Sequence, residues 1–377
     1  MNIDAALAIA GSGLANINAQ LALISHNVAN ASTPGYVTEV GTQQALSADG
    51  LGMGVVTGPA IRDVDAALQA SVYQQNAIVA GLQTTSNVMT AIDSVSGTPG
   101  QGGDIGSLLG NLQDAFSTLL NDPSNPTQQN QVVAAAGTLA LGINALSAAY
   151  TQQRQAAEDG IVSTVSSINA SLATIGSLSD QIMAAKQAGQ STADLENQRD
   201  AQVATLSQVL PVNVLEQPNG DMLITTASGV ELPIHGPADP LSTGEATMQP
   251  GAWYPGGGVP GITLGGADVT GALTGGQLGA QISFRDTALP TDQAELDEFS
   301  QNLASRFSDQ GLALFTDASG SVPAGGGAPV QAGYVGFAAE IQVNPAVRAD
   351  PALVRDGTTV IAGSASGASA FTPNPVG

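Results

Sequence analysis

The chain has 377 residues, and its 31 acidic residues against eight basic ones give a formal net charge of −23. Nucleic acids and anionic membrane surfaces bind basic patches, which so few basic residues do not build, so neither is expected as a partner. The absence of cysteine excludes disulfides, thiol nucleophiles and cysteine-ligated metals. The length leaves room for two or three domains.

The sequence offers no recognisable targeting segment. No stretch approaches the ~18 uninterrupted apolar residues of a membrane-spanning helix. The first 30 residues have no basic n-region, and polar residues interrupt their apolar run. We therefore expect neither a membrane span nor a cleaved signal peptide.

The first helix is predicted from about Asp4 to Ala31. Its apolar residues recur in steps of four and three, which makes a narrow stripe of the coiled-coil kind. Such a helix does not bury its stripe alone and needs a partner, so we predict an assembly interface at Ile3, Leu7, Ala10, Leu14, Ile17, Leu21, Ile24 and Val28.

Thr33-Pro34-Gly35 ends this helix, and residues 36–65 are predicted to be extended and rich in turns, so residues 1–65 form one segment. A second helix is predicted over 66–96. It has a similar stripe at Leu68, Val72, Val79, Leu82, Met89 and Ile92.

Residues 66–210 are predicted to form a bundle of long helices. After the second helix we expect a short one over about 105–120 and another from Pro126 towards Tyr150. A separate helix is predicted next, followed by one over 193–210 that Pro211 ends. The separate helix has a stripe at Ile161, Val165, Ile168, Leu172, Ile175, Leu178 and Ile182.

After Pro211 the apolar period changes from that of a helix to that of a strand, and residues 211–270 are predicted to form a small β-domain rich in Gly and Pro. A helix then returns within 271–315, and residues 316–377 read as loops and short strands. The predicted fold class is mainly α, with a long coiled-coil-like helical bundle and an outward β region.

Residues suited to catalysis are scattered. His26 and His235 are isolated in sequence, and no zinc, nucleophile-elbow or phosphate-loop motif occurs. The acids between Glu295 and Glu298 are predicted to lie at a solvated helix start. Trp253-Tyr254 is expected in the core or on the surface of the β-domain. We predict no enzyme activity, no cofactor and no metal site.

A polar motif closes the first helix: Asn27 and Asn30, three residues apart on one face, then Thr33, Pro34, Gly35 and Tyr36. The two amides are placed to bind backbone groups left unpaired at the helix end and in the following turn. Tyr36 is expected to anchor the outgoing strand.

Ser12-Gly13-Leu14, Asn27-Val28-Ala29-Asn30 and Thr33-Pro34-Gly35-Tyr36 together resemble the N-terminal signature of the axial proteins of the bacterial flagellum: rod, hook and hook-associated proteins. Three later segments resemble the FlgK family of hook–filament junction proteins (hook-associated protein 1). They are residues 194–200, residues 274–279 and Phe284-Arg285-Asp286.

The resemblance implies a structural subunit that self-assembles between hook and filament, outside the cell, after export through the flagellar type III route. It also implies three partners: the hook protein, a second junction protein and a cytoplasmic export chaperone. It further implies a C-terminal core helix that pairs with the first helix. The printed sequence ends at Val376-Gly377 without that helix.

Three alternatives stay open. A hook or distal-rod protein shares the N-terminal motif but not the bundle over 66–210. An enzyme on a flagellar scaffold requires a cluster of titratable groups in the β region, where only His235 and scattered acids occur. A secreted coiled-coil surface protein leaves the Thr33–Tyr36 motif unexplained.

Overall fold

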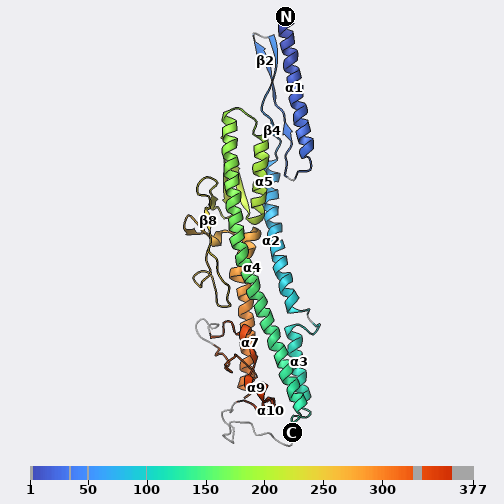
Figure 1. The fold of residues 1–377 in the computed structure, drawn as a ribbon, viewed down its shortest axis with the longest axis vertical. Helices are drawn as coiled ribbons and strands as arrows, with labels where there is room; N and C mark the ends of the chain where they lie inside the picture. The colour runs from blue at the N-terminus through green and yellow to red at the C-terminus, as the bar shows by residue number, and fades with distance from the viewer. Residues whose placement is uncertain (1–2, 34, 49–50, 99, 326–332, 359–377) are drawn as a thin grey trace. The chain divides into compact units, whose positions relative to one another are not determined.

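A computed structural model describes residues 3–33, 35–48, 51–98, 100–325 and 333–358. The described chain is mainly α-helical with several small sheets, as predicted (Figure 1). It forms two compact units, which we describe separately. Unit 1 comprises residues 1–84, 161–244 and 261–280, and unit 2 comprises residues 85–160, 245–260 and 281–377.

Two long helices each contribute one part to each unit. Helix α2 is Ala66–Ser96, as predicted, and helix α4 is Pro126–Gln187. The prediction of two separate helices between Pro126 and Ile182 is wrong, because α4 runs through residues 151–160 without a break. Arg154 and Glu158, which lie in this continuous segment, are buried.

Unit 1 begins with α1 (Ile3–Asn30), close to its predicted bounds, followed by short strands. Strand β1 (Glu39–Val40) pairs with β4 (Ile61–Arg62), and β2 (Gln43–Ala48) forms an antiparallel hairpin with β3 (Leu51–Thr57). We call α1 with β2 and β3 the N-terminal arm.

The core of unit 1 is built on the predicted stripe of α4. All seven stripe residues are buried, and α5 (Ala193–Val209) adds its own apolar side chains to the same core. Two antiparallel sheets complete the unit. One contains β5 (Val212–Glu216), β6 (Met222–Thr226) and β7 (Glu231–Leu232), and the other contains β8 (Leu241–Ser242), β9 (Thr263–Leu264) and β10 (Ala267–Asp268).

A short 3-10 helix, η1 (Thr270–Ala272), precedes α6 (Gly276–Ser283). A π-helical turn, η2 (Phe284–Ala288), then leads into α7 (Leu289–Asp309), so the helix predicted within 271–315 is present with this wider turn inside it.

Unit 2 packs α3 (Ile105–Leu119), the first part of α4 and α7 around one apolar core that includes Leu112, Leu139, Ile143 and Phe315. Its remaining elements are β11 (Phe315–Thr316), β12 (Gln342–Val343), α8 (Phe337–Glu340), α9 (Pro345–Ala349) and α10 (Leu353–Asp356). The part of the predicted 316–377 region that falls on residues 326–332 and 359–377 lies outside the described residues.

Two helices, α1 and α4, are long and apolar enough to cross a membrane by length and composition. Within the most apolar window, 44% of residues are buried in α4 and 6% in α1. Core helices of soluble proteins and N-terminal signal sequences meet the same two criteria. The expectation of no membrane span therefore stays a prediction.

Candidate assembly interface

The apolar stripe of α1 faces water along its whole length. All eight residues of the predicted stripe are exposed, and the seven larger side chains keep between 58% and 84% of their surface accessible. Burying a side chain of this size is worth roughly 1.5–3 kcal/mol. The stripe is therefore a large unused source of binding free energy.

The opposite side of α1 is the one that packs within the chain, and it is largely polar. Its least exposed residue is Asn16, which donates to Gln43 Oε1 at 2.9 Å and accepts from Thr57 Oγ1 at 3.1 Å. Ser12 Oγ accepts from the backbone N–H of Val55 at 3.2 Å. The hairpin is thus bonded to α1 through side-chain hydrogen bonds.

Gly54 allows the hairpin to approach α1 this closely. Its φ of +118° lies in a region that L side chains rarely adopt, and a Cβ there would collide with Ser12 Oγ. The hairpin therefore needs a glycine at this position.

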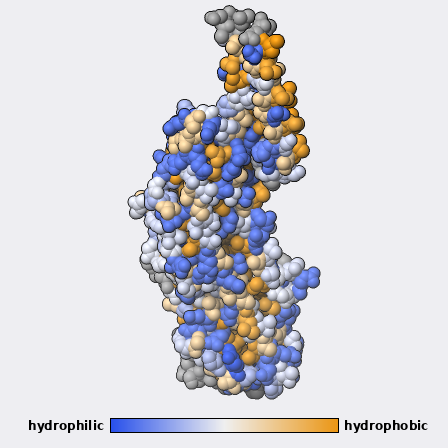
Figure 2. Space-filling view, turned by 45° about the horizontal axis from the view of Figure 1, so that its top comes forward, coloured by the Kyte–Doolittle hydropathy of each residue, from blue (hydrophilic) through white to orange (hydrophobic). Residues whose placement is uncertain are grey.

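The N-terminal arm inverts the usual arrangement of a globular fold. At 100° per residue, the stripe and the contact face centred on Asn16 lie roughly 130° apart around the helix axis. Polar groups meet inside the arm and apolar ones face outward, and Figure 2 shows apolar atoms gathered over it. Large exposed apolar surfaces are typical of sites of protein or membrane interaction, so this surface is the candidate assembly interface.

Helix α2 repeats this feature over part of its length. Leu68, Val72, Val79, Leu82 and Met89 are exposed, while Ile92, the last residue of the predicted stripe, is buried in the core of unit 2. The stripe of α2 is thus exposed up to Met89 and joins the core of unit 2 at Ile92.

The motif after α1 is a compact set of hydrogen bonds. Asn27 Nδ2 donates to the Glu39 carbonyl at 2.9 Å, and its Oδ1 accepts from the Glu39 N–H at 3.0 Å. The hydroxyl of Tyr36 also donates to Asn27 Oδ1, at 2.7 Å. Asn27 thus pairs with Glu39 as a neighbouring strand residue would.

Asn30 and Thr33 close the helix end itself. Asn30 Nδ2 donates to the His26 carbonyl at 3.1 Å, and Thr33 Oγ1 donates to Asn30 Oδ1 at 3.3 Å. Gly35 has a φ of +79°, as a turn residue does. Pro34, the remaining residue of the motif, lies outside the described residues.

His26, isolated in sequence, joins this group in space. Its Nδ1 lies 3.2 Å from the Tyr36 hydroxyl and 3.8 Å from Glu39 Oε1. Glu39 is buried, and burial raises the pKa of its carboxyl, while the nearby His26 acts in the opposite direction. A polar cluster therefore surrounds the point where the chain leaves α1.

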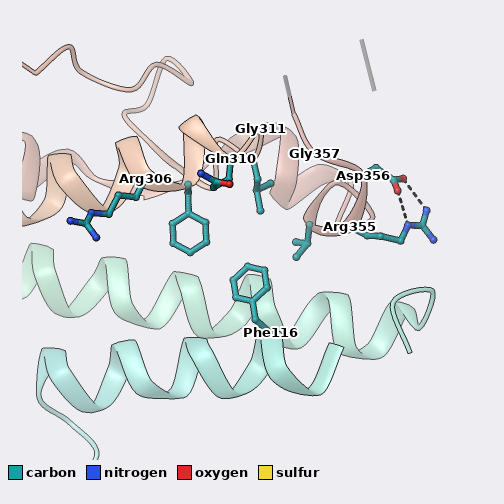
Figure 3. Close-up of a pocket in the computed structure, with 10 residues that line it drawn as sticks. Phe116, Arg306, Gln310, Gly311, Arg355, Asp356 and Gly357 are labelled. Carbon is teal, nitrogen blue, oxygen red and sulfur yellow. Dashed lines mark hydrogen bonds and ion pairs between the residues drawn. The ribbon is translucent and has the colours of Figure 1, made fainter. Parts of the chain in front are cut away.

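A cavity in unit 2 holds few groups suited to catalysis. It has a volume of about 440 Å³ and lies between α3, α7 and α10, where Phe116 and Phe307 stack at 5.7 Å (Figure 3). Its single carboxylate, Asp356, is paired with the adjacent Arg355. Among the described residues no cluster of three or more potential metal ligands occurs.

The structure also locates the aromatic, histidine and acidic residues singled out in the sequence. Trp253 is 58% exposed, so of the two expected locations the surface is the observed one. His235 Nε2 lies 2.9 Å from Asp221 Oδ1 and its Nδ1 lies 3.7 Å from Asp180. The expectation that the acids of residues 295–298 are solvated is wrong for Asp297, which is buried, while Glu295 and Glu298 are exposed.

Two family profiles match this chain, and both are of flagellar proteins. The profile of the family "Flagella basal body rod protein" matches residues 7–36, which include most of α1 and its closing motif, so this segment is similar to that of flagellar rod proteins. The profile "Flagellar hook-associated protein FlgK helical domain" matches residues 89–321, more than half of the chain. The chain belongs to the FlgK family of flagellar hook-associated proteins.

Individual relatives agree with this assignment. Flagellar hook-associated protein 1 of Salmonella typhimurium is 29% identical over 59% of this chain and 41% of its own length. The Escherichia coli K12 protein of the same name is 27% identical over 82% of this chain and 57% of its own. The chain therefore spans about half the length of the curated relatives it matches.

A solved structure also matches, that of the flagellar hook junction protein FlgK from Burkholderia pseudomallei. It has a TM-score of 0.52 and 26% sequence identity, and the match covers 68% of this chain and 45% of that one.

Proposed function

We propose that this chain is a structural subunit of the flagellar junction between hook and filament, and that the stripe of α1 is its assembly seam. The observation that carries the proposal is the outward-facing stripe from Ile3 to Val28 on a helix whose polar face is already occupied by its own hairpin. Membership of the FlgK family supports the location of this assembly seam in the flagellum.

The seam works by burial. A narrow heptad stripe packs against another helix by knobs-into-holes contacts, and the uncharged flanks of α1 let the two helices approach without electrostatic repulsion. In this proposal the partners of the subunit are sister copies, the hook protein and the second junction protein, and an export chaperone binds the chain before secretion. The assembled subunit is extracellular and has no catalytic role.

The alternative of a hook or distal-rod protein is less well supported. Its N-terminal signature is shared, but the FlgK helical-domain profile extends over residues 89–321. Among the described residues, we find no feature that favours a hook or distal-rod protein over a junction protein.

The seam is tested by placing a charge on it and next to it. Leu14→Asp and Leu21→Asp put a carboxylate on the stripe, whereas Ala15→Asp and Ala22→Asp add the same charge at exposed positions off it. We expect the first pair to abolish incorporation into flagella, because burying an unpaired carboxylate costs several kcal/mol. The second pair should assemble normally.

Incorporation is measured by immunolabelling of flagella from the producing bacterium, with circular dichroism of the purified variants as the folding control. Normal filament growth with Leu14→Asp and Leu21→Asp would show that the stripe is not the seam.

A further inference from the structure

The strand that follows α1 is held on one edge by two asparagine side chains from different helices. Asn27 of α1 bonds to both backbone groups of Glu39, as described above. Asn197 of α5 does the same two residues earlier: its Oδ1 accepts from the Val37 N–H at 3.2 Å, and its Nδ2 donates to the Val37 carbonyl at 3.2 Å. We call Asn27 and Asn197 the asparagine clamp.

The clamp completes a strand that is otherwise paired on one side only. Val40 pairs with Ile61 of β4, and the Asp63 N–H donates to the Thr38 carbonyl at 3.3 Å. Backbone groups of alternate residues point to opposite edges of a strand, so residues 38 and 40 face β4 and residues 37 and 39 face away from it. The amides of the clamp take the place of a neighbouring strand on that second edge.

A helix has no free main-chain groups along its length with which to pair a strand, because its own ladder uses them. Only side chains link α1 and α5 to this strand. A primary amide suits this task, since it offers one acceptor and two donors in a plane, much like a peptide group.

Each asparagine is oriented by a second donor to its Oδ1. For Asn27 this donor is the Tyr36 hydroxyl, at 2.7 Å. For Asn197 it is Arg62 Nη1, at 3.2 Å. Both asparagine side chains therefore have fixed amide orientations.

Arg62 is itself held in place by carboxylates of α5. Its Nε donates to Glu196 Oε2 at 3.1 Å and its Nη1 to Asp200 Oδ2 at 2.6 Å, and its side chain is only 5% exposed. Asn197 is buried as well. The clamp is thus anchored in the folded core of unit 1 on the α5 side.

We infer that Asn197 is a positioning residue for assembly: with Asn27 it fixes the direction in which α1 leaves α5, and so aims the apolar stripe. This inference rests on the proposed function for the role of the stripe. Asn197 contributes nothing to the stripe itself and lies far from the N-terminal motif in sequence, so its effect on assembly acts through residues 37–39, which lead into β1.

The test compares Asn197→Ala with Gln198→Ala in the full natural chain. Gln198 is the adjacent exposed residue of α5, and its described hydrogen bond goes to Asp194 within the same helix. With Asn197→Ala we expect amide exchange at Val37 to accelerate and incorporation into flagella to fall about tenfold, because two partly buried backbone groups lose their partner. Gln198→Ala should change neither.

A double-mutant cycle shows whether the two asparagines act as one joint. If they do, Asn27→Ala with Asn197→Ala reduces incorporation little more than either change alone. Independent contributions that add in full would overturn the clamp. Asn27→Ala alone serves as the second probe if Asn197→Ala lowers the helix content of the bundle, since Asn27 reaches the strand from the α1 side.

The outcomes separate this inference from the proposed function. Normal incorporation of Asn197→Ala, with Leu14→Asp still blocking assembly, would overturn the clamp and leave the seam intact. Loss of incorporation in Asn197→Ala with normal assembly of Leu14→Asp would overturn the seam, while a positioning role for Asn197 in assembly would stand.

Discussion

At the scale of single residues, Asp297 shows how a buried charge organises unit 2. Its carboxylate accepts from the backbone N–H of Gly336 at 2.7 Å and of Ala338 at 2.9 Å, and from Gln293 Nε2 at 3.0 Å. It therefore closes the start of α8 from a neighbouring helix. Burial raises the pKa of Asp297, and the three hydrogen bonds act in the opposite direction.

We predict that Asp297→Asn destabilises the chain by about 1–3 kcal/mol, because the new amide presents a donor to one of the two backbone N–H groups. A carboxyl whose pKa is raised on folding stabilises the folded state at pH values below its pKa in the unfolded chain. This stabilisation is lost as the pH rises through its pKa in the folded chain. The stability gap between wild type and Asp297→Asn should therefore narrow as pH rises above 3.8, the ordinary value.

Urea unfolding monitored by circular dichroism at several pH values measures this gap. Glu298→Gln is the matched control, because it removes the same charge from the adjacent, exposed position. A gap that widens as pH rises would contradict the prediction.

The sequence predicted some of these residues and missed others, for a physical reason. The stripe of α1 and the amide of Asn27 follow from periodicity and from the helix end, which are local features. Asp297 looked solvated because Gly336 and Ala338, which bury it, are about 40 residues away in sequence. Asn197 stayed unassigned for the same reason: its partner, Val37, is visible only in the folded chain.

At the scale of elements, the sequence predicted helix boundaries correctly where a proline marks them. Pro126 starts α4 and Pro211 follows the end of α5, as the missing N–H and fixed φ of proline dictate. The break expected between Tyr150 and Ile161 did not occur: α4 continues through this segment. Within it, buried Arg154 donates to three backbone carbonyls, those of Gln249, Ala252 and Arg285, which are too distant in sequence for the local pattern to indicate.

Two glycines within helices are predicted to respond in opposite ways to replacement by alanine. In α4, a Cβ at Gly176 would collide with the backbone carbonyl of Ile234, whereas in α3 a Cβ at Gly110 would meet nothing within 4 Å. We expect Gly176→Ala to destabilise the chain by about 1–3 kcal/mol through this overlap. Gly110→Ala should stabilise it by roughly 0.5–1 kcal/mol, because alanine loses less backbone entropy.

Thermal unfolding of the two variants beside wild type measures both effects. A stabilising shift for Gly176→Ala would show that the Ile234 carbonyl does not approach α4 as closely as described, and a destabilising shift for Gly110→Ala would contradict the second prediction.

At the scale of the whole molecule, the helix that bears the stripe carries little of the charge. The chain has a net charge of −23, yet among the 28 residues of α1 only Asp4 is acidic and none is Lys or Arg. In the proposed assembly, the net negative charge of two copies opposes their association, while the stripe itself adds no charge to the contact.

This distribution predicts that association of copies strengthens with salt. Screening shortens the range of repulsion to about 10 Å at 0.1 M ionic strength and about 3 Å at 1 M, and leaves apolar burial in place. Sedimentation velocity across that range measures the effect. Association that weakens with salt would indicate an interface held by ion pairs instead of the stripe.

In the proposed assembly, the outward stripe of α1 also makes the association of subunits depend on temperature. Covering apolar surface lowers the heat capacity, and near room temperature its driving force is almost entirely the entropy of released water. Contacts made through Leu14, Leu21 and their neighbours therefore tighten on warming and loosen on cooling. Subunits that associate through such an interface therefore bind one another more tightly at growth temperature than at low temperature.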